Sequence, residues 1–128
     1  MADILARDVM IKDVRTITGD RKVAYARLIM LRHNIGALPV VDNNEVVRGI
    51  ITQRDVDLAG EGVSDLLVSD LMTRTLIKAK ETTPLRWIVE KMIKTGIQRI
   101  PVLDEKSKLL GLVTQTCVIK ATLLHDLK

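Results

Sequence analysis

Gly49-Ile50-Ile51-Thr52-Gln53-Arg54-Asp55 is a stretch that the chain repeats, in altered form, as Gly111-Leu112-Val113-Thr114-Gln115-Thr116-Cys117. The two copies begin 62 residues apart. In each, a glycine and two apolar residues lead to Thr-Gln, a pattern typical of a buried strand that passes directly into a helix. The copies end differently, with an aspartate in the first and a cysteine in the second. We therefore expect two versions of one structural corner, one intact and one altered.

The repeat extends far beyond this stretch, because residues 8–56 align with residues 70–118 without a gap. The matched pairs include Asp8 with Asp70, Met10 with Met72, Met30 with Met92, Ile35 with Ile97, Pro39 with Pro101 and Asp42 with Asp104. A constant offset predicts two copies of one supersecondary unit, and a single unit of about 50 residues would be marginally stable alone. We expect a first motif at residues 1–62 and a second at 63–128, packed as one compact module.

Each copy predicts the same order of elements. In the second copy we expect a short helical segment at 70–72, an extended run at 75–79, a helix from Thr83 to Gly96, strands at 99–103 and 108–114, and a helix from Gln115 to about residue 126. In the first copy we expect strands at 37–41 and 46–52 and a helix at 54–59, which Gly60 and Gly62 end. The apolar helical faces are Val23, Ala26, Met30 and Leu31, and Leu85, Ile88, Val89, Met92 and Ile93.

The composition limits the class of protein. Apolar residues make up 47% of the chain and aromatic residues 2%, which predicts an aliphatic core. The lone cysteine, Cys117, excludes an internal disulfide and is typical of a reducing compartment, so we expect a cytoplasmic protein. No apolar run has the length of a membrane span, and residues 1–8 lack the pattern of an export signal. The net charge of +4 is spread along the chain, which is typical of a solvated mixed-charge surface.

These motifs together resemble the tandem CBS domain pair, often called a Bateman module. The resemblance rests on the two Asp-x-Met segments at 8–10 and 70–72, the runs at 37–42 and 99–104, and the Gly-x-x-Thr frames that begin at Gly49 and Gly111. It implies an α+β fold in which two β-α-β-β-α motifs, related by a pseudo-twofold axis, pack as one Bateman module. It also implies a sensor of adenine-containing ligands that assembles as a homodimer of modules.

The intact corner offers groups that a nucleoside requires. A ribose diol needs a carboxylate that accepts two hydrogen bonds, which Asp55 can supply, and Thr52 can bind a phosphate or orient that carboxylate. The resemblance places an apolar base slot on the other copy, formed by Thr75, Leu76, Ile77 and Ile97 together with Ile50, and phosphate contacts at Gln98 and Arg99. The alternatives are that Asp55 is only a carboxylate favoured at a helix start and that Arg99 is an exposed strand charge.

The altered corner combines Thr114 and Cys117 with residues of the first copy, namely Val14, Arg15, Thr16, Ile35, Gly36 and Ala37. A thiol is a poor hydrogen-bond acceptor and cannot hold a ribose diol as a carboxylate does. The missing diol contact should weaken ligand binding at this corner by about 1.5–3 kcal/mol. We therefore predict one good site in each chain. Cys117 could instead be a nucleophile or redox sensor, or a small residue of the core or cleft wall.

The predicted function is that of a regulatory module. It would bind an adenosyl ligand such as AMP, ADP, ATP or S-adenosylmethionine between the motifs and signal to a separate partner protein by a conformational change. No cofactor, catalytic residue or metal site is predicted, because His33 and His125 lack partners at metal-ligand spacing and no phosphate-cradling glycine loop is present. We expect a homodimer formed through the helix faces at 85–93 and 118–124. The alternatives are a nucleic-acid-binding adaptor that uses the basic surface, which a steep salt dependence would favour, and a nucleotide-acting enzyme.

Overall fold

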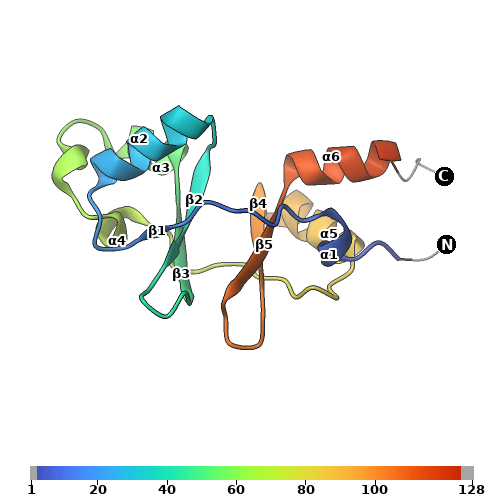
Figure 1. Cartoon of the computed structure of the whole chain (residues 1–128). Coiled ribbons are helices and arrows are strands. Elements are labelled where there is room, and N and C mark those ends of the chain that lie inside the picture. Colours follow the sequence, from blue (N-terminus) through green and yellow to red (C-terminus); the bar gives the residue numbers. More distant parts are fainter. Residues whose placement is uncertain (1–2, 125–128) are drawn as a thin grey trace. The chain divides into compact units, whose positions relative to one another are not determined.

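The computed structural model describes residues 3–124, apart from the side chain of Ser64, and its packing forms two compact units (Figure 1). The central unit consists of residues 14–76. The terminal unit combines the segment that ends at Asp13 with the segment that begins at Ile77. The boundaries of these packing units therefore differ from those of the sequence repeat.

The central unit is a three-stranded sheet with helices packed on it. Its elements are β1 (Ile17–Thr18), α2 (Val23–His33), β2 (Ala37–Val41), β3 (Val47–Thr52), α3 (Gln53–Ala59), η1 (Val63–Asp65) and α4 (Val68–Leu71). The strand order is β1-β2-β3, with β1 parallel to β2 and β2 antiparallel to β3. The strand predicted at 37–41 matches β2, and that predicted at 46–52 begins one residue later.

The terminal unit repeats the hairpin and its two flanking helices. Its elements are α1 (Ala6–Val9), α5 (Leu85–Thr95), β4 (Arg99–Leu103), β5 (Leu109–Thr114) and α6 (Gln115–Leu124). The strands β4 and β5 pair antiparallel, and β4 also forms a parallel bridge between Val102 and Ala79. The extended run predicted at 75–79 is therefore reduced to this one bridge. The predicted end of the last helix, near residue 126, and His125 lie outside the described residues.

Helix α5 begins later than its sequence predicts. Its first helical residue is Leu85, and Pro84 precedes it with extended backbone angles. The hydroxyl of Thr83 accepts a hydrogen bond from the Lys80 amide at 2.8 Å, so it closes the preceding turn and does not cap the helix. A threonine beside a proline can serve either role, and the backbone path here selects the turn.

The segment that begins each repeat, residues 8–11 in the first and 70–73 in the second, packs against a strand of the other repeat. We call these two stretches the leading segments. Ile11 and Leu112 exchange two backbone hydrogen bonds of 2.9 and 3.0 Å in the terminal unit. In the central unit, Thr73 and Ile50 exchange two of the same kind, also 2.9 and 3.0 Å. A Cβ atom at Gly49 would lie 2.7 Å from the Thr73 carbonyl oxygen and 2.8 Å from the sulfur of Met72. The glycine of each repeat therefore leaves the space into which the methionine of the other repeat's Asp-x-Met segment packs.

The repeated aspartates at the strand ends hold the hairpin turns. Asp42 Oδ1 accepts hydrogen bonds from the amides of Asn44 and Val46 at 2.8 and 3.0 Å. Asp104 makes the equivalent pair with the amides of residues 106 and 108. Desolvation alone would raise the pKa of Asp42, but these amides and the Arg48 guanidinium, which donates to Oδ2 at 2.9 Å, outweigh it and lower the pKa. The Pro-Val-x-Asp pattern therefore encodes a strand with its turn.

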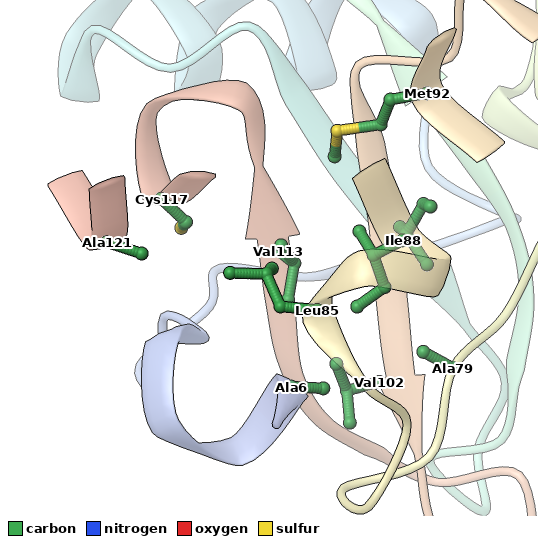
Figure 2. Close-up of a cluster of buried hydrophobic side chains, with 10 residues drawn as sticks. Ala6, Ala79, Leu85, Ile88, Met92, Val102, Val113, Cys117 and Ala121 are labelled. Atoms are coloured by element: carbon green, nitrogen blue, oxygen red, sulfur yellow. The ribbon is translucent and has the colours of Figure 1, made fainter. Parts of the chain in front are cut away.

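Each unit has its own aliphatic core. The terminal cluster is shown in Figure 2 and consists of Ala6, Ala79, Leu85, Ile88, Met92, Ile100, Val102, Val113, Cys117 and Ala121. The central cluster is Ile17, Val23, Ala26, Met30, Leu38, Val40, Ile51, Val56, Val63 and Val68. The predicted helix faces are wrong at their last members, because Leu31 is 66% exposed and Ile93 is 77% exposed. Each follows the last buried methionine by one residue, which turns its side chain away from the core.

Candidate functional site

The intact corner is a reciprocal hydrogen-bonded cap at the start of α3. Because β3 passes into α3 without a loop, Thr52 is both the last strand residue and the residue that caps the helix. Its hydroxyl oxygen accepts from the Asp55 amide at 3.0 Å, and its own amide donates to Asp55 Oδ2 at 2.9 Å. This arrangement is a capping box, which satisfies two amides that the helix leaves unpaired.

The cap leaves half of the Asp55 carboxylate available for a ligand. Within residues 3–124, Oδ2 accepts the Thr52 amide, while Oδ1 accepts no hydrogen bond and the carboxylate forms no ion pair. The side chain is half-buried, so it is reachable from solvent. An ionised carboxylate has about four acceptor positions, and the cap occupies one of them. The helix-start role and a ligand-binding role for Asp55 are therefore compatible.

The hairpin register brings residues of the two predicted corners together in the central unit. Ala37 pairs with Thr52, and the Gln53 amide donates to the Gly36 carbonyl oxygen at 2.9 Å. The sequence had assigned residues 35–37 to the altered corner and Thr52 with Asp55 to the intact one. Because β2 and β3 are antiparallel, the start of β2 must lie beside the end of β3.

The terminal unit repeats this regrouping. Arg99 pairs with Thr114, and the Gln115 amide donates to the Gln98 carbonyl oxygen at 3.1 Å. Gln98 and Arg99, predicted for the intact corner, thus lie beside the strand end that carries the altered one. Of the other predicted contact residues, Ile50 is buried opposite Pro39 on β2. Two are exposed, namely Thr16 and Thr75, and three are half-buried, namely Leu76, Ile77 and Ile97.

Cys117 occupies the position of Asp55 but is part of the core. The side chain is 7% exposed and belongs to the terminal cluster, in which it comes from the same helix as Ala121 (Figure 2). Its amide donates to the Thr114 hydroxyl oxygen at 3.2 Å, and that hydroxyl donates to the Cys117 sulfur at 3.3 Å. Thr114 therefore caps α6 as Thr52 caps α3, but Cys117 offers no carboxylate to accept a hydrogen bond as Asp55 does. A small core residue, one of the alternatives for Cys117, is therefore what the structure contains.

Arg99 is a partly desolvated cation. Burial lowers the pKa of its guanidinium, and the side chain is half-buried at the start of β4. The ion pairs found within residues 3–124 join Arg48 to Asp42 and Arg86 to Asp3, so neither involves Arg99. A desolvated guanidinium without a carboxylate partner is well suited to accept an anion from solution.

Among residues 3–124, no group of three or more histidine, cysteine, aspartate or glutamate side chains is placed to hold a metal ion. In the same range, no helix combines the length and the apolar character that crossing a bilayer requires.

Comparison with known proteins identifies the family. The CBS domain family matches residues 6–60 and again residues 68–123. The chain belongs to the CBS domain family. It carries two CBS domains in tandem, which confirms the resemblance that the repeat suggested. The α+β fold with two such motifs is confirmed as well.

The curated relatives that this chain resembles are proteins of different kinds. The chain is 36% identical over 115 residues to inosine-5′-monophosphate dehydrogenase of Methanocaldococcus jannaschii, a match that covers 90% of the chain and 23% of the enzyme. It thus spans less than a quarter of that relative's length. It is also 32% identical to a CBS domain-containing protein of Dictyostelium discoideum, with 88% of the chain and 87% of that protein covered.

Solved structures share the fold over almost the whole chain. A CBS domain pair in complex with 5′-methylthioadenosine and S-adenosyl-L-methionine has a TM-score of 0.88 and 30% identity, covering 99% of this chain and all of that one. A CBS domain-containing protein from Agrobacterium tumefaciens has a TM-score of 0.82 and 29% identity, covering 92% of this chain and 98% of that one.

Proposed function

We propose that this CBS domain pair is a regulatory module that binds an adenosyl small molecule and signals its presence to a separate partner. The observation that carries the proposal is the half-satisfied carboxylate of Asp55, held in place by Thr52 and open at Oδ1. The relative solved with 5′-methylthioadenosine and S-adenosyl-L-methionine supports the ligand class, because its identity of 30% extends over the full length.

The central unit supplies the groups that an adenosine requires. Asp55 Oδ1 would accept a hydrogen bond from a ribose hydroxyl, a charge-assisted contact that contributes about 1.5–3 kcal/mol. The end of β3 and the start of β2 lie side by side there, and the half-buried Ile35 and Gly36 would offer small and apolar surface for a purine, with the buried Ala37 behind them. We infer a weaker corner in the terminal unit, in which Arg99 would bind a phosphate but Cys117 cannot hold a diol.

A sensor needs a ligand-dependent equilibrium and not a reaction. A ligand shifts the balance of two states only by the difference of its affinities for them, and a partner protein would read the resulting change. The chain's likeness to isolated CBS domain pairs favours this role over catalysis, since its match to the dehydrogenase covers 23% of that enzyme. We propose on this basis that the chain itself is not an enzyme.

We also propose that two copies of the chain associate through α5 and α6. Large apolar side chains on these helices are exposed, with Ile93 at 77%, Ile119 at 60% and Leu123 at 74%. Exposed apolar side chains that gather on helix surfaces are typical of protein interfaces. Burying them between copies would remove this surface from water.

A thermal-shift screen tests the adenosyl proposal. AMP, ADP, ATP, 5′-methylthioadenosine and S-adenosylmethionine are added to the wild type and to Asp55→Ala, and the rise in melting temperature is measured. We expect at least one compound to raise the melting temperature of the wild type, and the variant to lose most of that rise. An equal rise in the variant would contradict the role of Asp55.

Asp70→Ala is a matched control, because Asp55→Ala also removes a hydrogen bond at a helix start. Asp70 Oδ2 accepts the Leu67 amide at 3.0 Å in the same central unit, much as Asp55 Oδ2 accepts the Thr52 amide at 2.9 Å. Both variants should lower the melting temperature of the free protein. Asp70→Ala should keep the ligand-induced rise, which separates lost stability from lost binding.

A further inference from the structure

A surface pocket of about 390 Å³ lies over the outer face of α2. Its lining includes Tyr25, Leu28, Ile29 and Arg32, whose spacing along α2 places them on one face, opposite the buried Val23, Ala26 and Met30. Arg15, from the segment before β1, also lines the pocket. A volume of this size suffices for a small organic molecule.

The charged part of the lining is entirely cationic. Arg15, Arg32 and His33 are its titratable side chains apart from Tyr25. Neither ion pair found within residues 3–124 involves any of them. Desolvation, and then the charges of Arg15 and Arg32, lower the pKa of His33, which favours its neutral imidazole and leaves the two arginines as the cations of the lining. A concave surface that gathers cations without a carboxylate attracts anions.

The remaining lining is apolar and partly fixed in place. Leu28 and Ile29 provide aliphatic surface, and Tyr25 provides an aromatic ring. The Arg21 guanidinium lies 3.9 Å from the centroid of that ring, a cation–π contact that restrains the tyrosine and adds a further positive charge nearby. The pocket therefore combines a surface for a flat or apolar body with cations for an anionic head.

We propose that this pocket on α2 binds a small soluble molecule that carries a phosphoryl group on an aromatic or apolar body. Arg15 and Arg32 hold the phosphoryl oxygens, since guanidinium groups bind phosphate through two parallel hydrogen bonds. Tyr25 and Leu28 contact the body of the molecule. The site does not include Asp55 or Thr52, whereas Arg15 and Thr16 of its lining are residues that the sequence also assigns to the altered corner.

Phenyl phosphate and inorganic phosphate are suitable probes, because they share the phosphoryl group and differ in the apolar body. Binding of each is followed by the amide shifts of α2 in two-dimensional NMR spectra of the full chain. We expect both to shift these amides, with phenyl phosphate binding more tightly than inorganic phosphate. Each of Arg15→Gln and Arg32→Gln should weaken binding of phenyl phosphate by about tenfold.

Arg27→Gln is the matched control. Arg27 is exposed on the same helix but is absent from the pocket lining. Its replacement by glutamine changes the net charge by the same amount as Arg32→Gln. It should leave binding of phenyl phosphate unchanged. Equal losses in Arg27→Gln and Arg32→Gln would indicate attraction by net charge alone and would overturn the proposal.

A short DNA duplex, titrated at moderate salt, distinguishes a soluble phosphoryl ligand from a nucleic acid. If the duplex binds through Arg15 and Arg32 while phenyl phosphate causes no shift, the pocket recognises a nucleic acid backbone and the proposal is wrong. If phenyl phosphate binds and depends on both arginines, the proposal holds whatever the adenosyl screen shows.

Discussion

Substitution of Gly49 by alanine tests how the leading segments pack. A Cβ atom at this position would lie 2.7 Å from the Thr73 carbonyl oxygen and 2.8 Å from Met72 Sδ. The methionine side chain can move, but the carbonyl belongs to backbone that exchanges two hydrogen bonds with Ile50. The added methyl group must therefore push the segment away from β3 or strain the strand.

The expected loss in the free energy of unfolding is about 2–4 kcal/mol. Forcing an extra carbon into a packed site costs about 1–3 kcal/mol. Loss of one of the two hydrogen bonds between Thr73 and Ile50 adds about 1 kcal/mol. Gly111→Ala should behave in the same way, because its Cβ would lie 2.6 Å from Met10 Sδ and 2.7 Å from the Ile11 carbonyl oxygen.

Urea denaturation followed by circular dichroism measures these losses. Gly19→Ala is the control, because its Cβ would meet the Ser69 Cβ at 3.2 Å as its nearest neighbour, a contact that a small shift relieves. We expect it to cost about 1 kcal/mol or less. If Gly49→Ala is no less stable than Gly19→Ala, the close approach of residues 72–73 to β3 is wrong.

Three further predictions concern the altered corner, the hairpin turn and the interface. Cys117→Asp should let residue 117 pair with Thr114 as a capping box and add a second binding event for the adenosyl ligand, and unchanged calorimetric stoichiometry would contradict this. The pKa of Asp42 is lowered in the folded state, so its ionised carboxylate stabilises the fold at pH values above the pKa of the unfolded carboxyl group. This contribution is lost as the pH falls through the folded pKa. Asp42→Asn should therefore show a smaller difference in the free energy of unfolding between neutral and acidic pH, measured by urea denaturation. Ile119→Glu should shift the sedimentation velocity of the chain towards a monomer, and an unchanged profile would exclude α6 from the interface.

Local features of the fold follow directly from the sequence. The strands β2 and β4 were predicted residue for residue, and the turn aspartates Asp42 and Asp104 mark where each hairpin reverses. The turns depend on hydrogen bonds from amides no more than four residues away to Asp42 and Asp104, and the strands were recognised from the short apolar runs that precede these turns. A short segment therefore carries the full information for them.

The buried faces of the helices were predicted except at their edges. Met30 and Met92 are buried as expected, whereas Leu31 and Ile93 are exposed. Hydrophobic periodicity identifies the centre of a helix face, but its width depends on how closely the neighbouring elements approach. An apolar residue at the margin can therefore lie in the core or face outward with the same sequence pattern.

The sequence by itself determined the repeat, the two strands of each hairpin, the turns, and the threonine that precedes the helix after each hairpin. The repeat is read from the constant offset, and the other features depend on residues within a few positions of one another. Only the tertiary structure decided that the leading segment of each repeat packs on a strand of the other repeat and that residues 36–37 lie beside Thr52. It also decided that Cys117 is in the core, while Asp55 Oδ1 accepts no hydrogen bond from the residues that the structure describes. These outcomes depend on contacts between residues far apart in the chain, and an identical offset of 62 residues is compatible with packing either within a repeat or between repeats.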